Sequence, residues 1–406
     1  MQTVLSILWI LFLIVQAIVA LYVLVPFVSL LSYFVIRLFR FKTPYDRKPF
    51  LTDKNFEFGF IVTAHQEVQF ILPIVDSILK QTYRNFHVYV VADDCDLTSL
   101  HFTDTRVTIL KPEPALHAKI KSIRYALAHF NRKHDAVIIL DSDNLIHPNF
   151  LDVMNNHFRK GYRVVQCDFK PKNTDTVYAR MDAIGDMFNF FTDREARMRL
   201  GLSASIWGSG VAIDYDLYNE VEYNNFLGGF DKKLQAHLVQ RVNRIAFAPE
   251  AILYDEKIAS DKSLETQRTR WISAYFKYFN ESWAIFRNGL KTANLNLMYF
   301  GFTALQPPLF IVLGAALLFT VVDYFVHFPL FIAWLVILLS FVLSFIGIVA
   351  LKGKSLRYLQ ALFMIPVFVL RQVMALFKMG KAKKSFLKTQ HTELVFIDDI
   401  LKKNFS

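Results

Sequence analysis

The chain has 406 residues, of which 54% are hydrophobic and 20% are charged, and its formal net charge is +11. This length and composition exclude a single small domain and an ordinary soluble protein, so we expect a membrane protein. The positive charge does not indicate nucleic acid, because much of it lies where anionic lipid headgroups explain it. It lies beside the apolar segments and in a C-terminal group of Lys378, Lys381, Lys383, Lys384 and Lys388.

The first predicted element is a membrane anchor over residues 1–40. Residues 4–36 form a dense apolar run with no Lys or Arg before it, and five basic residues follow it: Arg37, Arg40, Lys42, Arg47 and Lys48. By the positive-inside rule, the N-terminus lies outside and the following domain lies in the cytoplasm. Residues 17–20 mimic a signal-peptidase site, but the apolar run continues far beyond them. We therefore expect an uncleaved anchor in the cytoplasmic membrane.

Residues 41–271 are predicted to form a cytoplasmic α/β domain. Short apolar runs at 58–62, 86–92, 107–110 and 136–140 indicate strands, and residues 67–81 and 117–130 indicate helices. Strands that alternate with helices predict a largely parallel sheet with helices on both faces.

Acidic residues follow two of these strands directly. Asp93 and Asp94 come after the second strand, and Asp141-Ser142-Asp143 comes after the buried run 136–140. Ligands of parallel sheets bind beyond the carboxyl ends of the strands. Hard carboxylate oxygens favour Mg²⁺ or Mn²⁺, so we expect one acid of the Asp141–Asp143 pair to hold a metal ion. Asp93 is placed either to accept a hydrogen bond from a base or ribose, or to end a turn or cap a helix.

Aromatic and apolar segments follow the α/β domain. Residues 272–296 are predicted to form an amphipathic helix in the membrane interface. Residues 297–351 are predicted to form a hairpin of two spans, 297–322 and 328–351, in which Pro307-Pro308 breaks a straight helix. Lys352, Lys354 and Arg357 follow, so the hairpin returns to the cytoplasm. In the last segment, 352–406, residues 358–379 favour a broken interfacial helix over a further span because they include Arg371.

A short polar string lies between the domain and the interface helix. Gln267, Arg270 and Trp271 are spaced i, i+3 and i+4, which places them on one face of a helix. They offer an amide, a bidentate anion clamp and a stacking platform. This combination suits a sugar pyrophosphate beside a sugar chain.

Several strings together resemble the family 2 glycosyltransferases. The first are residues 61–67 (IVTAHQE), 77–83 (SILKQTY) and 90–94 (VVADD). Later strings follow in the family's order and spacing: Asp141-Ser142-Asp143, Gly208-Ser209-Gly210, Tyr254-Asp255-Glu256 and Gln267-Arg268-Thr269-Arg270-Trp271. The resemblance covers about residues 55–290. The last string and the flanking spans are similar to the membrane-embedded branch that includes cellulose, chitin and hyaluronan synthases.

The resemblance implies a GT-A fold, the α/β fold of nucleotide-diphospho-sugar transferases, with transmembrane helices on either side. It implies that Asp93 contacts the uracil of a nucleotide sugar, that Asp141 holds the nucleotide and that Asp143 holds the metal. Other implied ligands of the pyrophosphate and acceptor sugar are Gln267, Arg270 and Trp271. Lys121, near Lys119 at the start of a helix, is similar to lysines that face phosphates in the family.

The general base departs from the family pattern. The family has Thr-Glu-Asp or a similar acidic pair, and this chain has Gly229-Phe230-Asp231. The aspartate is kept, so the resemblance implies that Asp231 removes the acceptor proton, while Phe230 replaces the glutamate. A different register places His237 there, and a histidine also serves as a base. Asp231 as a helix cap is the structural alternative.

The sequence thus predicts an inverting, metal-dependent glycosyltransferase that uses Mg²⁺ or Mn²⁺. Its expected partners are a nucleotide sugar, with a UDP-sugar implied by the family, and a growing polysaccharide or other glycan at the lipid bilayer. A homo-oligomer or an export partner would complete a path for a polymer. Two alternatives stay open: transfer of a single sugar to a lipid-linked acceptor, and a catalytically degenerate membrane protein that binds nucleotide sugars.

Overall fold

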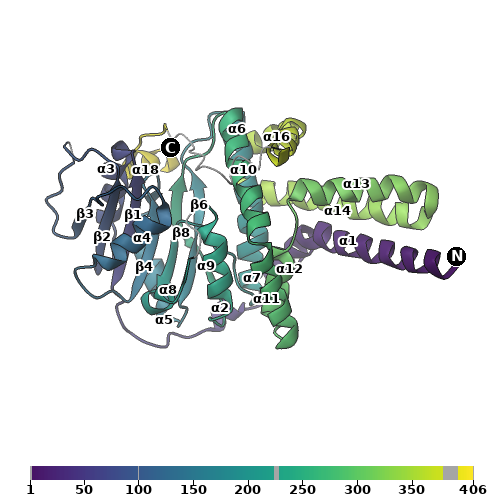
Figure 1. Cartoon of the computed structure of the whole chain (residues 1–406), viewed down its shortest axis with the longest axis horizontal. Helices are drawn as coiled ribbons and strands as arrows, with labels where there is room; N and C mark the ends of the chain where they lie inside the picture. Colours follow the sequence, from purple (N-terminus) through teal and green to yellow (C-terminus); the bar gives the residue numbers. More distant parts are fainter. Residues whose placement is uncertain (1, 99, 224–227, 378–391, 406) are drawn as a thin grey trace.

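The computed structural model describes residues 2–98, 100–223, 228–377 and 392–405. Figure 1 shows three parts in space: a sheet with its covering helices, a layer of helices beside it, and three long helices that project from that layer. The N-terminus lies at the far end of the projecting helices, and the C-terminus lies against the sheet. The C-terminal group of basic residues from Lys378 to Lys388 lies outside the described residues.

The sheet has eight strands in the order β3-β2-β1-β4-β7-β6-β8-β5. Their bounds are β1 Phe58–His65, β2 Phe86–Asp93, β3 Val107–Leu110, β4 Ala136–Asp141, β5 Leu145–Ile146, β6 Val164–Pro171, β7 Val211–Asp214 and β8 Ala246–Asp255. The four predicted strands are confirmed as β1 to β4, and they pair in parallel. All eight residues of β2 are buried, as a central strand covered on both faces requires.

The second half of the sheet is mixed, so the prediction of a largely parallel sheet is wrong there. β7 pairs antiparallel with both β4 and β6, and β5 pairs antiparallel with β8. Gly210 precedes β7 with a φ of +64°, and a Cβ atom there would lie 2.3 Å from the sulfur of Cys167. Glycine therefore lets the chain turn into the sheet in close contact with β6.

Helices of the domain cover both faces of the sheet (Figure 1). Their bounds are α2 Pro44–Arg47, η1 Val68–Phe70, α3 Ile71–Leu79, α4 Lys119–Ala128, α5 Phe150–Arg159, α6 Val177–Phe190, η2 Phe191–Glu195, α7 Ala196–Arg199, α8 Tyr215–Asn219 and α9 Phe230–Val239. The helices predicted at 67–81 and 117–130 are confirmed as η1 with α3, and as α4. One hydrophobic core joins the strands to these helices.

The chain then leaves the sheet through a layer of helices. Their bounds are α10 Asp261–Lys277, α11 Phe279–Lys291, α12 Leu295–Ala304, α13 Leu309–Val326, α14 Phe328–Gly353, α15 Leu356–Ala361, η3 Leu362–Met364, α16 Ile365–Phe377 and α18 Ile397–Phe405. The predicted span 297–322 is two helices, α12 and α13, because Pro307-Pro308 lies in the break between them. The segment of the second predicted span, 328–351, is a single long helix, α14.

The three projecting helices are α1 (Gln2–Leu38), α13 and α14, which pack side by side (Figure 1). A buried polar group joins them: Gln16 donates to Asp323 at 3.3 Å and accepts from the indole of Trp334 at 2.7 Å. By length and composition, four segments of the described chain are apolar enough to span a membrane. The fourth, Leu356–Met374, is a broken helix whose α16 packs against α10 and contacts α13, and whose α15 packs against α14.

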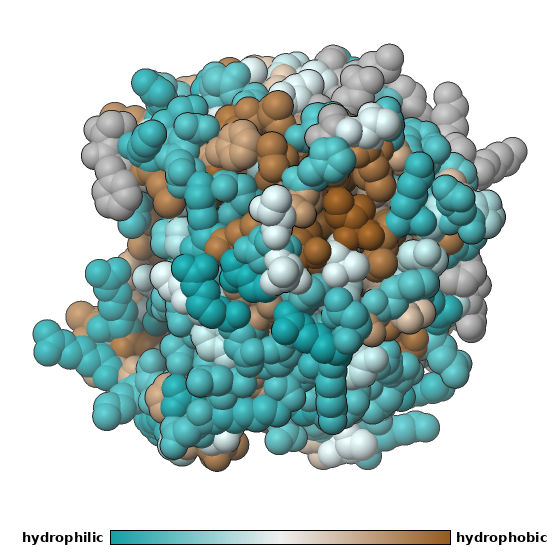
Figure 2. Space-filling model, turned by 90° about the vertical axis from the view of Figure 1, so that its left-hand side faces the viewer, coloured by the Kyte–Doolittle hydropathy of each residue, from teal (hydrophilic) through white to brown (hydrophobic). Residues whose placement is uncertain are grey.

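The end of the molecule opposite the three projecting helices is more hydrophilic than the helices are. Figure 2 shows the face turned away from the three projecting helices, which is largely hydrophilic with hydrophobic residues near its middle. In contrast, α1, α13 and α14 expose many large apolar side chains along their length. The molecule is therefore amphipathic along its long axis.

Close packing of α11 on α12 provides a test of the fold. A Cβ atom at Gly289 would lie 2.4 Å from the main-chain nitrogen of Met298, whereas one at Gly314 of α13 would meet no atom within 4 Å. We expect Gly289→Ala to destabilise the protein by about 1–3 kcal/mol through overpacking. The matched change Gly314→Ala should be neutral or stabilising by up to about 1 kcal/mol. Thermal unfolding midpoints of the two purified variants in detergent would measure this, and equal midpoints would contradict the packing.

Candidate active site

The carboxyl ends of β1, β2 and β4 form one edge of the sheet, and the predicted acids lie there. Because β1 pairs in parallel with both neighbours, His65 stands opposite Asp93 and Thr63 stands opposite Asp141. These residues and Asp143 line a cavity of about 2000 Å³. The sheet therefore brings the two acidic strand ends to one cavity.

Asp141 and Asp143 lie in different environments. The carboxylate of Asp141 is half-buried and accepts a hydrogen bond from Lys119 Nζ at 2.5 Å. The same ammonium group donates to the carbonyl oxygen of Gly208 at 2.9 Å. Asp143 is buried, and the ammonium group of Lys172 donates to its main-chain oxygen. Burial lowers the pKa of Lys172, and the charge of Asp143 opposes that shift.

An oxygen-ligated cation fits Asp143 in combination with substrate. In the described parts of the chain, three His, Cys, Asp or Glu ligand atoms lie within 4.8 Å of one another at His65, Asp93 and His117, a group that does not include Asp143. Mg²⁺ is usually bound through one or two carboxylates together with substrate phosphates. The buried carboxylate of Asp143 on the cavity wall suits a metal that binds with a diphosphate.

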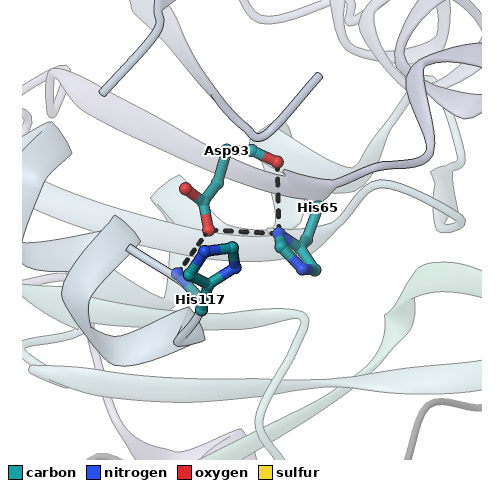
Figure 3. A group of neighbouring side chains, drawn as sticks. All are labelled: His65, Asp93 and His117. Carbon is teal, nitrogen blue, oxygen red and sulfur yellow. Dashed lines mark hydrogen bonds and ion pairs between the residues drawn. The ribbon is translucent and has the colours of Figure 1, made fainter. Parts of the chain in front are cut away.

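Asp93 is buried, and protein groups already contact its carboxylate (Figure 3). The main-chain N–H groups of Leu116 and His117 donate to its two oxygens at 2.7 and 2.8 Å. The Nδ1 atom of His65 lies 3.2 Å from the carboxylate. Asp93 thus holds the loop that leads into α4, and the imidazoles of His65 and His117 extend beside it. A contact with the nucleobase, as the sequence predicts, would have to share this carboxylate with those protein groups.

The predicted polar face of α10 does lie on the cavity. Gln267, Arg270 and Trp271 all line it. Burial lowers the pKa of the Arg270 guanidinium, and the charges of Asp141 and Asp231 oppose that shift. Trp271 is 37% exposed, and its indole lies 6.0 Å from that of Trp207.

Asp231 enters the same cavity from the first turn of α9. Gly229, two residues before Asp231, has a φ of +69°, and a Cβ atom there would lie 2.9 Å from Cβ of Ala274 and 2.8 Å from the ring of Tyr278. Only glycine allows α9 and α10 to approach so closely. This contact brings Asp231 into electrostatic range of Arg270.

The alternatives for Asp231 have less support from the geometry. His237 does not line the cavity, and its ring lies 3.7 Å from Glu220. Burial lowers the pKa of this imidazole. The helix begins at Phe230, and it has no side-chain cap, so Asp231 does not act as one.

Comparisons with known proteins add the family. A sequence model described as Glycosyltransferase like family 2 matches residues 56–274, just over half of the chain. The chain belongs to this glycosyltransferase family. No curated protein sequence matches it. Membership confirms the predicted family and the α/β fold class, whereas the assignment to the synthase branch stays a prediction.

Solved glycosyltransferase structures are similar at a low level. TarS of S. aureus in complex with UDP-GlcNAc is 17% identical over 50% of this chain and 59% of its own, with a TM-score of 0.37. A longer TarS chain is matched over only 38% of its length. Mannosyltransferase PcManGT from Pyrobaculum calidifontis, in complex with GDP-Man and Mn²⁺, is 17% identical over 84% of this chain and 99% of its own, with a TM-score of 0.46. Similarities of this size say nothing about the substrates of this glycosyltransferase.

Phe230 gives this glycosyltransferase an apolar wall where the family pattern has an acid. Its ring lies 5.2 Å from the ammonium nitrogen of Lys119. A Cβ atom at Gly208 would lie 3.2 Å from the same ring, so the ring packs directly on the glycine. Phe230 therefore covers one side of the Asp141–Lys119 ion pair.

Two residues of the site were not distinguished from the sequence. Lys119 lines the cavity, whereas Lys121 is exposed and does not line it. Arg268 is buried between the rings of Trp271 at 4.3 Å and Phe368 at 5.3 Å, and it donates to Asp182 at 2.9 Å. Lys119 was recognised as a candidate beside Lys121, but no sequence signal pointed to Arg268.

The two lysines of α4 form a matched pair for a test. We expect Lys119→Met to weaken nucleotide-sugar binding by about tenfold or more, because it removes the charge-assisted hydrogen bonds beside Asp141. Lys121→Met should bind the nucleotide sugar as the unchanged protein does. Isothermal titration calorimetry of both variants would measure the affinities. If Lys121→Met weakens binding and Lys119→Met does not, Lys121 is the phosphate-facing residue, as the sequence predicted.

Proposed function

We propose that this glycosyltransferase is inverting and metal-dependent, and that it moves a sugar from a nucleotide sugar to an acceptor hydroxyl at the cytoplasmic membrane. A UDP-sugar is the expected donor. The observation that carries the proposal is the position of Arg270 within electrostatic range of both Asp141 and Asp231 in one cavity. A base and a leaving-group cation on opposite sides of a reacting carbon are what a displacement with inversion needs.

Asp231 is the proposed general base. Its carboxylate takes the proton of the acceptor hydroxyl while the hydroxyl oxygen bonds to the anomeric carbon. The bond from that carbon to the phosphate oxygen breaks, and its electron pair leaves with the nucleoside diphosphate. A single displacement inverts the anomeric centre and requires no covalent enzyme intermediate.

Several groups stabilise the departing diphosphate. The guanidinium of Arg270 and the ammonium of Lys119 both lie beside Asp141. Asp143 would hold Mg²⁺ or Mn²⁺, which acts as a Lewis acid toward phosphate oxygens when bound. Asp93 and Asp141 are the proposed nucleotide ligands, and Gln267 and Trp271 complete the site beside the acceptor.

The arrangement of charges supports a membrane position with the catalytic domain in the cytoplasm. The basic residues around Arg37 to Lys48 and around Lys352 to Arg357 follow the ends of α1 and α14 that lie at the domain (Figure 1). The N-terminus and the short turn between α13 and α14 lie at the other end of the bundle. This is the distribution of charge that the positive-inside rule gives for a cytoplasmic domain.

A growing polysaccharide or other glycan is the acceptor that the resemblance implies. A polymer made at this site would need a path through the bilayer, from a homo-oligomer or an export partner. A lipid-linked acceptor needs no such path.

The metal site yields the first prediction for this function. Asp143→Ala should abolish release of nucleoside diphosphate that depends on Mg²⁺ or Mn²⁺, because it deletes the proposed oxygen ligand. The assay uses purified protein in detergent, each metal in turn, a panel of nucleotide sugars, and the native membrane extract as the source of acceptor. Unchanged release in the variant would refute the metal assignment. Binding without release for every donor, in the unchanged protein, would favour a degenerate binding protein instead.

The base assignment gives a second prediction. Asp231→Asn should slow transfer by about a hundredfold or more and leave nucleotide-sugar affinity nearly unchanged. His237→Ala serves as the control for the other register and should transfer at the normal rate. Single-turnover rates separate the two, and NMR of the product should show an inverted anomeric centre. Loss of transfer in His237→Ala alone would make the histidine the base.

A further inference from the structure

The cavity does not end at the α/β domain. It continues between α13, α14 and α16, where three helix faces line it. We call this part the apolar arm. Its lining residues recur at helical spacing: Leu309, Leu313 and Leu317 on α13; Leu338, Phe341, Val342, Phe345 and Ile346 on α14; and Ile365, Phe368, Val369 and Gln372 on α16.

The apolar arm reaches about as deep as one leaflet of a bilayer. From Leu309 to Leu317 a helix rises about 12 Å at 1.5 Å per residue. The segment from Leu338 to Ile346 on the antiparallel helix α14 has the same length. The hydrocarbon core is about 30 Å thick, so an arm of this depth stops near the bilayer centre. A channel for a polymer would have to cross the whole core.

The lining also suits hydrocarbon rather than sugar. Apart from Gln372, the lining side chains of these three helix segments are aliphatic or aromatic. Sugar hydroxyls buried without hydrogen-bond partners cost free energy at every group. Acyl chains make no such demand, and they contact side chains of this kind with no loss relative to the bilayer.

Three of the cations that line the cavity are already paired with carboxylates. Arg268 pairs with Asp182 at 2.9 Å, and Arg197 pairs with Asp193 at 2.6 Å. Lys257 lies between Asp186 and Asp255. A lipid phosphate would compete with these carboxylates for the cations. A phosphate acceptor also needs no general base, because it is already an anion. The presence of Asp231 in the cavity therefore favours a hydroxyl acceptor.

The polar end of the cavity offers contacts for a sugar ring. The partly exposed indole of Trp271 lies on α10 beside Gln267, whose side-chain oxygen is buried without a hydrogen-bond partner among the residues that the structure describes. An aromatic face and an unsatisfied amide oxygen match the apolar face and the hydroxyl donors of a sugar.

We propose that the acceptor is a neutral glycolipid whose acyl chain lies in the apolar arm and whose sugar hydroxyl reaches Asp231. This inference rests on the proposed glycosyl transfer and names its acceptor class. The glycolipid hydroxyl gives its proton to Asp231, its oxygen bonds to the anomeric carbon of the donor, and the nucleoside diphosphate leaves with the electron pair of the broken bond. The product is a glycolipid that is longer by one sugar.

Neighbouring leucines of α13 provide a matched test. Leu317 is 57% exposed and lines the apolar arm, and Leu318 is 60% exposed and does not line it. The full chain is placed in phosphatidylcholine nanodiscs with the active donor and monoglucosyl-dioleoylglycerol as the acceptor. We expect Leu317→Trp to lower transfer by about tenfold or more, because the larger side chain fills the arm. Leu318→Trp should transfer within about twofold of the unchanged rate, since surface changes away from such features have small effects.

A second pair on α14 tests whether a loss of transfer in the first pair reflects a folding defect. Val342 is 48% exposed and lines the arm, and Leu343 is 59% exposed and does not. Val342→Trp should reproduce the loss, and Leu343→Trp should not. Both pairs should retain nucleotide-sugar affinity, because the substituted residues lie outside the polar part of the cavity.

A labelling arm separates the acceptor from the activity. A photoreactive monoglucosyl-diacylglycerol should label α13, α14 or α16 in the unchanged protein, and Leu317→Trp should reduce that labelling. Labelling without transfer to any acceptor would support the lipid site and refute the proposed activity. Transfer to a soluble oligosaccharide with no labelling of these helices would overturn the glycolipid acceptor and leave the activity intact. If decaprenyl phosphate competes with the labelling more strongly than monoglucosyl-dioleoylglycerol does, the proposal of a neutral head group is wrong. If the two members of each variant pair transfer sugar at equal rates, the proposal that the apolar arm binds the acyl chain is wrong.

Discussion

The close approach of α9 to α10 at Gly229 is the contact on which the site depends. With any side chain at this position, the first turn of α9 would have to move away from Ala274 and Tyr278. That turn carries Asp231, and α10 carries Arg270. The positive φ of one glycine thus helps to set the separation between the proposed base and the guanidinium that is proposed to bind the diphosphate.

Buried ion pairs hold the other side of α10 in place. Arg268 leaves the motif face and pairs with Asp182 of α6, and Lys257 ties the end of β8 to Asp186 of the same helix. Removing one partner of such a pair would leave an uncompensated buried charge, which costs about 3–5 kcal/mol. The stacking of Arg268 on Phe368 extends this network to α16. A shift of α16 would therefore reach the helix that carries the polar motif.

The sequence revealed the parallel half of the sheet because its strands are buried apolar runs that end in acids. It also placed Gln267, Arg270 and Trp271 on one face, since helical spacing alone decides that. It did not separate Lys119 from Lys121, because the two point about 160° apart on a helix and only packing fixes which one faces the site. The break between α12 and α13 was expected at its prolines, but α12 packs on α11 through glycine contacts that composition does not show. Such long-range contacts determine side-chain orientation and helix packing, which local sequence patterns do not specify.

The apolar arm supplies position rather than affinity. An acyl chain that moves from the bilayer into a groove of leucine and phenylalanine exchanges one apolar surrounding for another, so little hydrophobic free energy is gained. Discrimination between lipids must therefore come from the head, at Trp271, Gln267 and Asp231. Because the acyl chains of the lipid stay in the leaflet, the arm limits how far the sugar head group can extend from the membrane toward the sheet. A site built in this way selects an acceptor by the height and chemistry of its hydroxyl.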